Sequence, residues 1–247
     1  MATPPCIWDP PPTDLTLPEG EVHVWRASLN LPREQTLALA QTLSAGERER
    51  AARFHFEADG RRFAVGRGLL RAILGRYLRI APSNVQFSVG QHGKPALAQS
   101  LGQAAIRFNL AHSGELALYA ISHNEVGIDI ELIRPIQDSE QIAERYYSHR
   151  ERAAQHSLTQ EGWNEAFLRH WTRKEAYLKA RGCGLSLEPD QFEVLPHPDG
   201  SLMLDVAGDP GEATRWSLVD LTPAGDCVGA LAVEGHAWSL SCRQWVG

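Results

Sequence analysis

Two carboxylates alternate with two isoleucines in the segment Val-Gly-Ile-Asp-Ile-Glu at residues 126–131. In a β-strand, residues i and i+2 lie on the same face, so Asp129 and Glu131 would project together, opposite Ile128 and Ile130. Neighbouring carboxylates repel each other unless a cation lies between them. A small set of oxygen ligands suits Mg²⁺, which accepts further oxygens from water and phosphate. The pair is a candidate magnesium site, although the pattern alone is more typical of a solvated strand edge.

A third acidic residue lies on a helix that we predict over about residues 162–180. Phe167, Trp171, Glu175 and Lys179 are spaced by four residues, which places them in one stripe along the helix. Because the stripe begins with two aromatic core residues, Glu175 and Lys179 are expected to be partly buried. Buried charges need a partner or a metal. Glu175 could therefore join the candidate magnesium site; the alternative is an ordinary (i, i+4) ion pair with Lys179.

Most of the basic residues are arginines, and many of them lie in one region of the chain. Only three of the 24 are lysines, at positions 94, 174 and 179. Such positions are candidates for sites that need a compact ammonium rather than a planar guanidinium, unless they are simply left over on solvated helix faces. Residues 44–79 hold nine arginines and four acids. This local excess suits a polyphosphate ligand or an acidic protein partner, or it is a solvated helix face.

Two shorter motifs could also contact phosphate. Lys94 lies in a Gly93-Lys94-Pro95 turn, which can present an ammonium group to an anion. His112 lies in the strand-like run Phe-Asn-Leu-Ala-His-Ser at 108–113 and could donate a hydrogen bond to a phosphate oxygen. A single lysine or histidine of this kind is more often structural or exposed.

Taken in order, four motifs resemble one family, the 4′-phosphopantetheinyl transferases of the longer, surfactin-synthetase type. They are GKP at 93–95, FNxxHS at 108–113, GxDxE at 127–131 and WxxKEAxxK at 171–179. The resemblance covers roughly residues 40–195, and the last two motifs are the specific ones. It implies an α+β fold made of two similar halves in pseudo-twofold arrangement, with the active site in the cleft between them. The short acyl-carrier-protein synthases of the family are trimers, whereas the longer type would be a monomer.

The resemblance also implies a reaction. The 4′-phosphopantetheine arm of coenzyme A would be transferred to a serine hydroxyl of an acyl or peptidyl carrier protein, releasing adenosine 3′,5′-bisphosphate. Asp129, Glu131 and Glu175 would hold Mg²⁺ on the pyrophosphate, and metal and cations dominate such chemistry. Lys179 would contact the α-phosphate and stabilise or protonate the leaving oxygen. The base that deprotonates the serine would be Glu175, with a metal-bound water as the rival.

Further contacts with coenzyme A are implied for Arg50, Lys94, Asn109, His112 and Lys174. Two positions depart from the family pattern. Ala111 stands where the family usually has serine, so that one hydrogen bond to the substrate is missing. Glu47 stands where some members have lysine, which suggests that a contact with the 3′-phosphate has moved to Arg48 or Arg50.

The helices and strands that must position these residues are predicted from hydrophobic periodicity and from capping and turn residues. Helices are expected over 32–43, from a capping box at Ser44, over 59–79, over 138–147, from a second capping box at Ser148, and over 162–180. Short strands are expected over 85–131 and from Phe192 onward. Seven identities recur at an offset of 104 residues, as a duplicated α+β unit would leave them. We therefore expect an extended Pro-rich segment at 1–20, a cationic subdomain at 21–124, and a subdomain with the carboxylates at 125–247.

Composition limits the alternatives. With a net charge of −6 over 247 residues, a general nucleic-acid binder is not expected. The sequence has no apolar run near the length of a membrane span. The scattered cysteines argue against a zinc ribbon and a disulfide scaffold, so we expect a reducing, cytoplasmic location. Two other functions remain open at this stage: another Mg²⁺-dependent phosphohydrolase acting on coenzyme A or a nucleotide, and a non-enzymatic module that binds acidic helices.

Overall fold

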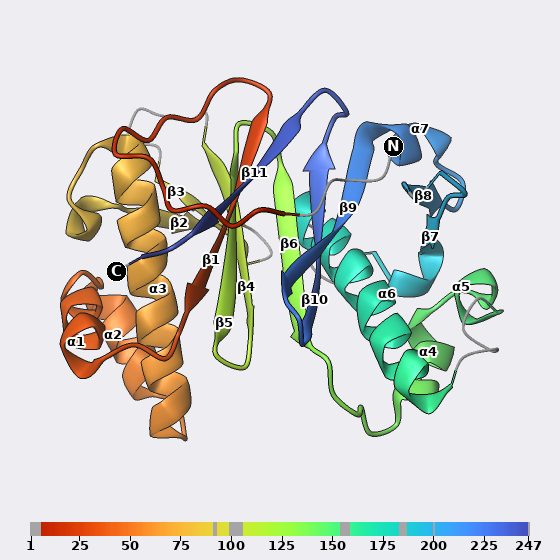
Figure 1. Ribbon diagram of the computed structural model, residues 1–247, viewed down its shortest axis with the longest axis horizontal. Helices are drawn as coiled ribbons and strands as arrows, with labels where there is room; N and C mark the ends of the chain where they lie inside the picture. The colour runs from red at the N-terminus through yellow and green to blue at the C-terminus, as the bar shows by residue number, and fades with distance from the viewer. Residues whose placement is uncertain are drawn as a thin grey trace.

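The chain folds into two lobes of helix and sheet that lie side by side (Figure 1). The computed structural model describes residues 6–90, 93–98, 106–153, 159–182, 187–199 and 201–246. Figure 1 shows the four-stranded and three-stranded sheets between α3 (Glu57–Leu78) of the first lobe and α6 (Gln160–Arg181) of the second. None of the helices in the described ranges is long and apolar enough to cross a membrane.

The first lobe is built on a four-stranded sheet in the order β11-β1-β5-β4. Its strands are β1 (Glu21–Ser28), β4 (Arg107–Ser113), β5 (Leu116–Ser122) and β11 (Ser239–Gln244). The helices are α1 (Arg33–Gln41), α2 (Ala45–Ala52) and α3 (Glu57–Leu78), and a 3-10 turn, η1 (Pro82–Asn84), leads to the hairpin of β2 (Phe87–Val89) and β3 (Pro95–Leu97). The apolar stripe of α3 packs on one face of the sheet and forms a core that includes Leu70, Ile73 and Tyr119.

The second lobe is built on a three-stranded sheet in the order β6-β10-β9. Its strands are β6 (Val126–Leu132), β9 (Trp216–Ala224) and β10 (Cys227–Glu234), and α6 (Gln160–Arg181) packs on it. The smaller elements are α4 (Ser139–Tyr146), α5 (His149–Ala153), η4 (Pro189–Gln191), β7 (Phe192–Pro196), β8 (Leu202–Val206) and α7 (Pro210–Arg215). Sequence periodicity did not predict α7, a short helix that Asp209 caps by accepting a hydrogen bond from Glu212 N.

A shared apolar core joins the two lobes. Ile128 and Ile130 of β6 are almost fully buried against Val24 and Leu118 of the first sheet. Because side chains alternate along a strand, Gly127, Asp129 and Glu131 point the other way, toward α6. The predicted division of the two faces of this strand is confirmed, and the core that the isoleucines enter lies between the two lobes.

Both predicted capping boxes form, and in each the capping glutamate also binds a basic residue of the long helix. Glu47 caps α2 and also binds Arg71 of α3, with 2.6 Å between Oε2 and Nη2. Glu151 caps α5 in the same way and binds Lys174 of α6, with 2.8 Å between Oε2 and Nζ. The Arg71 guanidinium donates to carbonyls at the 3-10 turn η1, and the Lys174 ammonium donates to carbonyls at η4. The two halves therefore repeat a buried ion pair as well as a helix pattern.

The ends of the chain depart from the expected division at residue 124. We expected 125–247 to form the second half, but β11 pairs in parallel with β1 of the first sheet. It does so because the apolar side chains of Leu240 and Cys242 pack into the shared core. In the described part of the Pro-rich segment, Asp9 forms a parallel bridge with Arg243 of β11, and Leu15 is buried. A disulfide joins Cys6 to Cys242 across 236 residues, a pairing that cysteine spacing did not predict.

Candidate active site

Gly127 allows α6 to lie directly against β6. A Cβ atom at this position would stand 2.0 Å from the carbonyl oxygen of Ala176 and 2.2 Å from the amide nitrogen of Ala180. No side chain can be accommodated at such distances without moving the helix. The glycine of the GxDxE motif thus brings one turn of α6, with Glu175 and Lys179, next to Asp129.

Asp129 lies at the centre of the candidate site. Its side chain is 7% exposed, and its Oδ1 accepts a hydrogen bond of 2.5 Å from Lys179 Nζ. The other oxygen, Oδ2, is buried and has no hydrogen-bond partner. Burial raises the pKa of Asp129 to about 7; Lys179 opposes the shift, and the negative charges of Glu175 and Glu131 add to it. The structure therefore places Glu131 and Glu175 close enough to Asp129 for their negative charges to act on its carboxylate.

These residues fit a divalent cation. Glu131 and Glu175 are half-buried, and Glu131 Oε2 accepts from Ser113 Oγ at 2.8 Å. Within the described ranges, no three acidic, histidine or cysteine side chains are already gathered at metal-ligating distances. However, an unpartnered buried oxygen beside two further carboxylates is the donor chemistry that Mg²⁺ prefers. A cation would also remove the repulsion among them.

His112 is at the edge of this site. It lies near the end of β4 and is exposed. The pKa of His112 is lowered, mainly because the surrounding protein displaces water from the ring and also because Lys179 and Arg62 are nearby cations. The ring is therefore placed to donate or accept a hydrogen bond at the rim of the carboxylate cluster.

Lys174 is not at the site, contrary to the expectation that it contacts phosphate. Its side chain is 2% exposed and its ammonium is enclosed by Glu151 and the carbonyls of Pro189 and Phe192. Lys174 lies on a different face of α6 from Glu175 because adjacent helix residues point about 100° apart. Lys174 stabilises the second lobe in the way that Arg71 stabilises the first.

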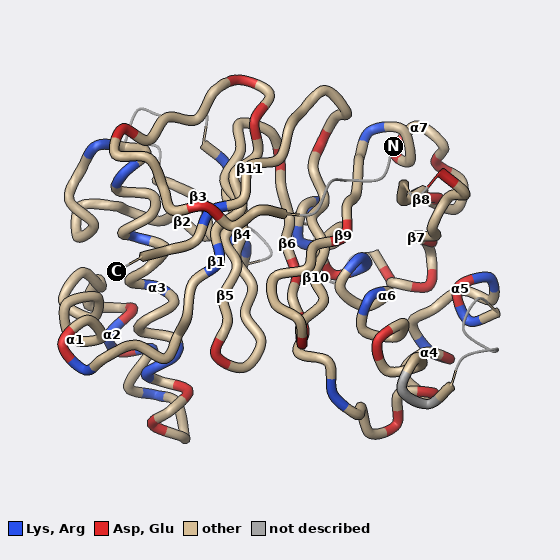
Figure 2. The backbone as a smooth tube through the Cα atoms, viewed as in Figure 1, with Lys and Arg blue, Asp and Glu red and all other residues tan. Residues whose placement is uncertain are grey.

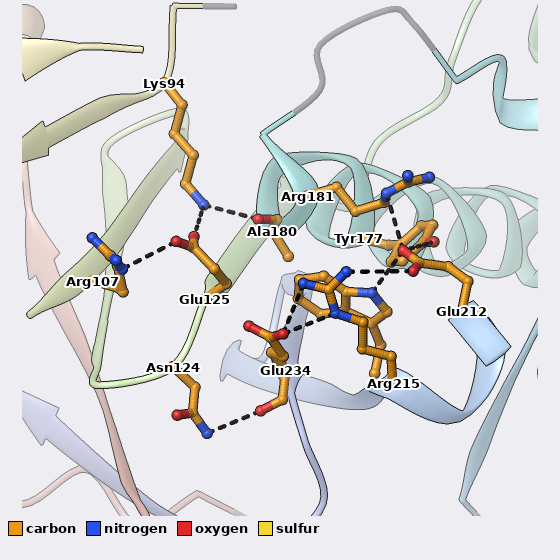
Figure 3. Close-up of polar contacts among 11 residues, drawn as sticks. Lys94, Arg107, Asn124, Glu125, Tyr177, Ala180, Arg181, Glu212, Arg215 and Glu234 are labelled. Carbon is orange, nitrogen blue, oxygen red and sulfur yellow. Dashed lines mark hydrogen bonds and ion pairs between the residues drawn. The ribbon is translucent and has the colours of Figure 1, made fainter. Parts of the chain in front are cut away.

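Lys94 and Asn109 also make contacts within the protein. Lys94 Nζ donates to Glu125 Oε2 at 3.1 Å and to the carbonyl of Ala180 at 3.0 Å (Figure 3). Asn109 is buried, and its Oδ1 accepts from the backbone amide of Ile128 at 2.9 Å. The turn that carries Lys94 and the strand that carries Asn109 both belong to the first lobe, whereas their partners belong to the second.

A concave region lies between α2, α3 and the β2–β3 hairpin. It encloses about 590 Å³ and its lining includes Arg50, Phe63, Arg67 and Phe87. Basic residues recur along α2 and α3 (Figure 2), and Arg50 lies 5.1 Å from the centre of the Phe63 ring. Cationic and aromatic groups together suit a phosphorylated heterocycle.

Of these residues, Arg50 was predicted individually, Arg67 was predicted only as one of the nine arginines of residues 44–79, and Phe63 was not predicted as a site residue. Phe63, Arg67 and Arg71 are spaced by four, as Phe167, Trp171 and Glu175 are on α6. That spacing was the available signal. Glu47 also lines the cavity, where its carboxylate binds Arg67 and Arg71.

Comparison with known proteins identifies the class. A family model described as "4'-phosphopantetheinyl transferase, N-terminal" matches residues 25–124, and one described as "4'-phosphopantetheinyl transferase superfamily" matches residues 125–233. The chain belongs to the 4′-phosphopantetheinyl transferase superfamily. The α+β fold and the transfer of phosphopantetheine from coenzyme A to a carrier protein, both expected from the motifs, are confirmed. The phosphohydrolase alternative finds no support.

Two curated relatives agree with this assignment. The chain is 42% identical over 233 residues to the 4′-phosphopantetheinyl transferase HetI of Nostoc sp., covering 94% of this chain and 95% of the relative. It is 32% identical over 176 residues to the transferase Sfp of Bacillus subtilis, covering 71% and 76%. A solved structure, an ACPS–CoA complex of Chronobacterium ammoniagenes, matches 43% of this chain and 93% of its own, at 21% identity and a TM-score of 0.36.

Proposed function

We propose that this transferase uses Mg²⁺ and that Asp129, Glu131 and Glu175 hold the ion against the pyrophosphate of coenzyme A. The observation that carries the proposal is the buried, unpartnered Oδ2 of Asp129 beside two further carboxylates. The ion, when bound, would neutralise charge on the pyrophosphate oxygens. The three acids come from one strand and one helix, so the packing of α6 on β6 fixes their relative positions.

In this proposal Lys179 assists the leaving group. The oxygen of the carrier serine forms a bond to the phosphorus that bears pantetheine, and the bond from that phosphorus to the bridging oxygen breaks. The bridging oxygen leaves with adenosine 3′,5′-bisphosphate. Lys179, which is half-exposed and bound to Asp129 before substrate arrives, transfers its hydrogen bond to that oxygen. An ammonium can give up a proton at this step, whereas a guanidinium cannot.

Glu175 is our choice for the group that accepts the serine proton. It is half-buried on α6, one turn before Lys179, and forms part of the same carboxylate cluster as Asp129. His112 is placed at the rim to contact a phosphate oxygen. In this proposal Glu175 accepts the proton of the serine, and Lys179 supplies a proton to the leaving oxygen.

The nucleotide end of coenzyme A is proposed to bind in the cavity of about 590 Å³. Arg50 and Arg67 supply positive charge, and Phe63 and Phe87 supply ring surfaces. Arg48 does not replace them, because its guanidinium donates to the carbonyl of Leu43. This assignment moves the contacts expected of Lys94, Asn109 and Lys174 to α2 and α3.

The carrier is proposed to approach from the side of Glu131. An apolar cavity of about 200 Å³ opens there, lined by residues that include Ile142, Phe167 and Trp171. It gives a carrier protein an apolar contact surface next to the reacting phosphate. Both lobes of the cleft come from one chain, which supports a monomer, and we propose a cytoplasmic enzyme. The family of carriers, whether of fatty-acid, polyketide or peptide synthesis, is to be found by experiment.

The proposal is tested by incubating the protein with coenzyme A, Mg²⁺ and a panel of apo carrier proteins, and then weighing the carriers. The parent is expected to add one phosphopantetheine mass to at least one carrier, and Asp129→Ala is expected to add almost none. Chelation of the metal should abolish transfer, and added Mg²⁺ should restore it. Full transfer by Asp129→Ala, or by the chelated protein, would overturn the metal assignment.

A further inference from the structure

β4 and β6 are the facing edge strands of the two sheets, yet backbone hydrogen bonds join neither to the other in the described chain. Side chains make the connection instead. Asn109 Oδ1 accepts from the amide of Ile128 at 2.9 Å, and Ser113 Oγ accepts from the amide of Leu132 at 3.0 Å. The two acceptors on β4 are four residues apart, and so are the two donors on β6.

The carboxylates of the candidate site lie between these two anchored amides. Asp129 follows Ile128 directly, and Glu131 precedes Leu132. Ser113 also donates to Glu131 Oε2 at 2.8 Å, so that one hydroxyl holds both the backbone and a side chain of β6. An unpaired edge strand has free amides that would otherwise bind water and allow the strand to shift.

We infer that Asn109 and Ser113 are positioning residues: they hold β6 to the first lobe so that Asp129 and Glu131 face α6 at the spacing the metal requires. Lys94 supports the start of the same strand, because its Nζ donates to the carbonyl of Val126 at 3.1 Å. The inference rests on the proposed metal site, and it gives the FNxxHS motif a role other than direct contact with coenzyme A.

The experiment measures metal binding without turnover. Mn²⁺ is titrated into the full-length protein with coenzyme A and no carrier, and free Mn²⁺ is followed by electron paramagnetic resonance. Ser113→Ala is expected to weaken Mn²⁺ binding about ten-fold, as loss of a group that orients a ligand does. Ser113→Thr, which keeps the hydroxyl, is expected to restore it. Ser122→Ala is the matched control: Ser122 is buried on β5 and accepts the backbone amide of Asn124, in the turn before β6 and outside the contact between β4 and β6.

Steady-state assays complete the test. Both Ser113→Ala and Asn109→Ala should raise the Mg²⁺ concentration for half-maximal activity, with the KM for coenzyme A changed less than about two-fold. Unchanged Mn²⁺ affinity in Ser113→Ala overturns the inference, even if Asn109→Ala does not fold. A raised KM for coenzyme A with normal Mn²⁺ affinity in Asn109→Ala would make Asn109 a substrate contact instead.

A different result would refute the proposed metal site itself. If Asp129→Ala binds Mn²⁺ as tightly as the parent, the ion is held elsewhere and the proposed carboxylate site is wrong. If Asp129→Ala loses Mn²⁺ while Ser113→Ala does not, the carboxylate site stands and only the positioning role is refuted.

Discussion

At the scale of single residues, the site depends on a few side chains whose chemistry has no close substitute. Asp129 is buried, and its Oδ2 has no hydrogen-bond partner. Its Oδ1 accepts a hydrogen bond from the ammonium of Lys179. In a chain where nearly every basic residue is arginine, a lysine at this position indicates that a guanidinium does not serve. Two predictions separate the roles of charge, proton donation and substrate binding.

Lys179→Arg is expected to lower kcat by about 100-fold while the KM for coenzyme A changes little, because the variant keeps a positive charge but cannot donate a proton. The measurement is steady-state transfer to a carrier protein. Lys179→Met, which also removes the charge, should raise the KM as well. If the arginine variant is as active as the parent, Lys179 acts only through its charge.

Arg67→Met is expected to raise the KM for coenzyme A about ten-fold with kcat nearly unchanged, since the nucleotide end lies far from the reacting phosphorus. The penalty should shrink when 3′-dephospho-coenzyme A replaces coenzyme A, if Arg67 contacts the 3′-phosphate. Arg53→Met is a suitable control, because the Arg53 side chain is 77% exposed and is not among the residues that line the cavity. An equal effect in the control would count against a specific contact.

At the scale of elements, the important contact is that between α6 and β6. The helix carries Glu175 and Lys179, the strand carries Asp129 and Glu131, and Gly127 lets them approach. The same helix is held from its other side by the buried pair of Lys174 and Glu151, with an ammonium that is 2% exposed.

Gly127→Ala is expected to destabilise the protein by about 3 kcal/mol, because the added methyl group would overlap the backbone of Ala176 and Ala180. For a chain of this size that corresponds to a fall in Tm of roughly 6–12 °C, measured by thermal unfolding. Gly46→Ala is the matched control: a Cβ there meets nothing within 4 Å, and the change should be neutral or slightly stabilising. Equal Tm values for the two variants would show that α6 can move away at little cost.

Lys174→Met is expected to lower the free energy of unfolding by about 3–5 kcal/mol, since it leaves Glu151 buried without its partner. At a temperature where the variant is folded, the KM for coenzyme A should be unchanged. The double variant Lys174→Met/Glu151→Gln should recover part of the lost stability, because it removes the unpaired charge. A raised KM in a stable Lys174→Met protein would return Lys174 to the list of substrate contacts.

At the scale of the whole molecule, the two lobes share a core and a strand. Ile128, Ile130 and Leu231 of the second sheet pack with Val24 and Leu118 of the first. The C-terminal strand β11 lies beside β1. A repeated α+β unit is visible in the helices and ion pairs, but the halves are not independent in this arrangement.

A fragment of residues 125–247 is therefore expected not to fold by itself, because isolation would expose the shared core and leave β11 without β1. Circular dichroism and the dispersion of amide resonances would measure this. The fragment of residues 1–124 should also fail to fold by itself. Mixing the two fragments is the control: folding of the mixture would show that neither fragment was damaged. A cooperative thermal transition of the isolated C-terminal fragment would contradict the expectation.

The spacing of residues along the sequence was enough to predict much of the local structure of this protein. Alternation along β6 predicted which side chains point together, and the four-residue spacing along α6 predicted the stripe that contains Glu175 and Lys179. Ser44 and Ser148 predicted two helix starts. These features depend on neighbours within a few residues, so the sequence contains them directly.

Tertiary structure decided the partners of the remaining residues. Lys94, Asn109 and Lys174 have types that bind phosphates, but their partners lie between 15 and 86 residues away along the chain. Similarly, β11 joined the first sheet and Cys6 met Cys242. Which of several possible partners a polar side chain finds depends on how the lobes pack, and no spacing along the chain specifies that packing.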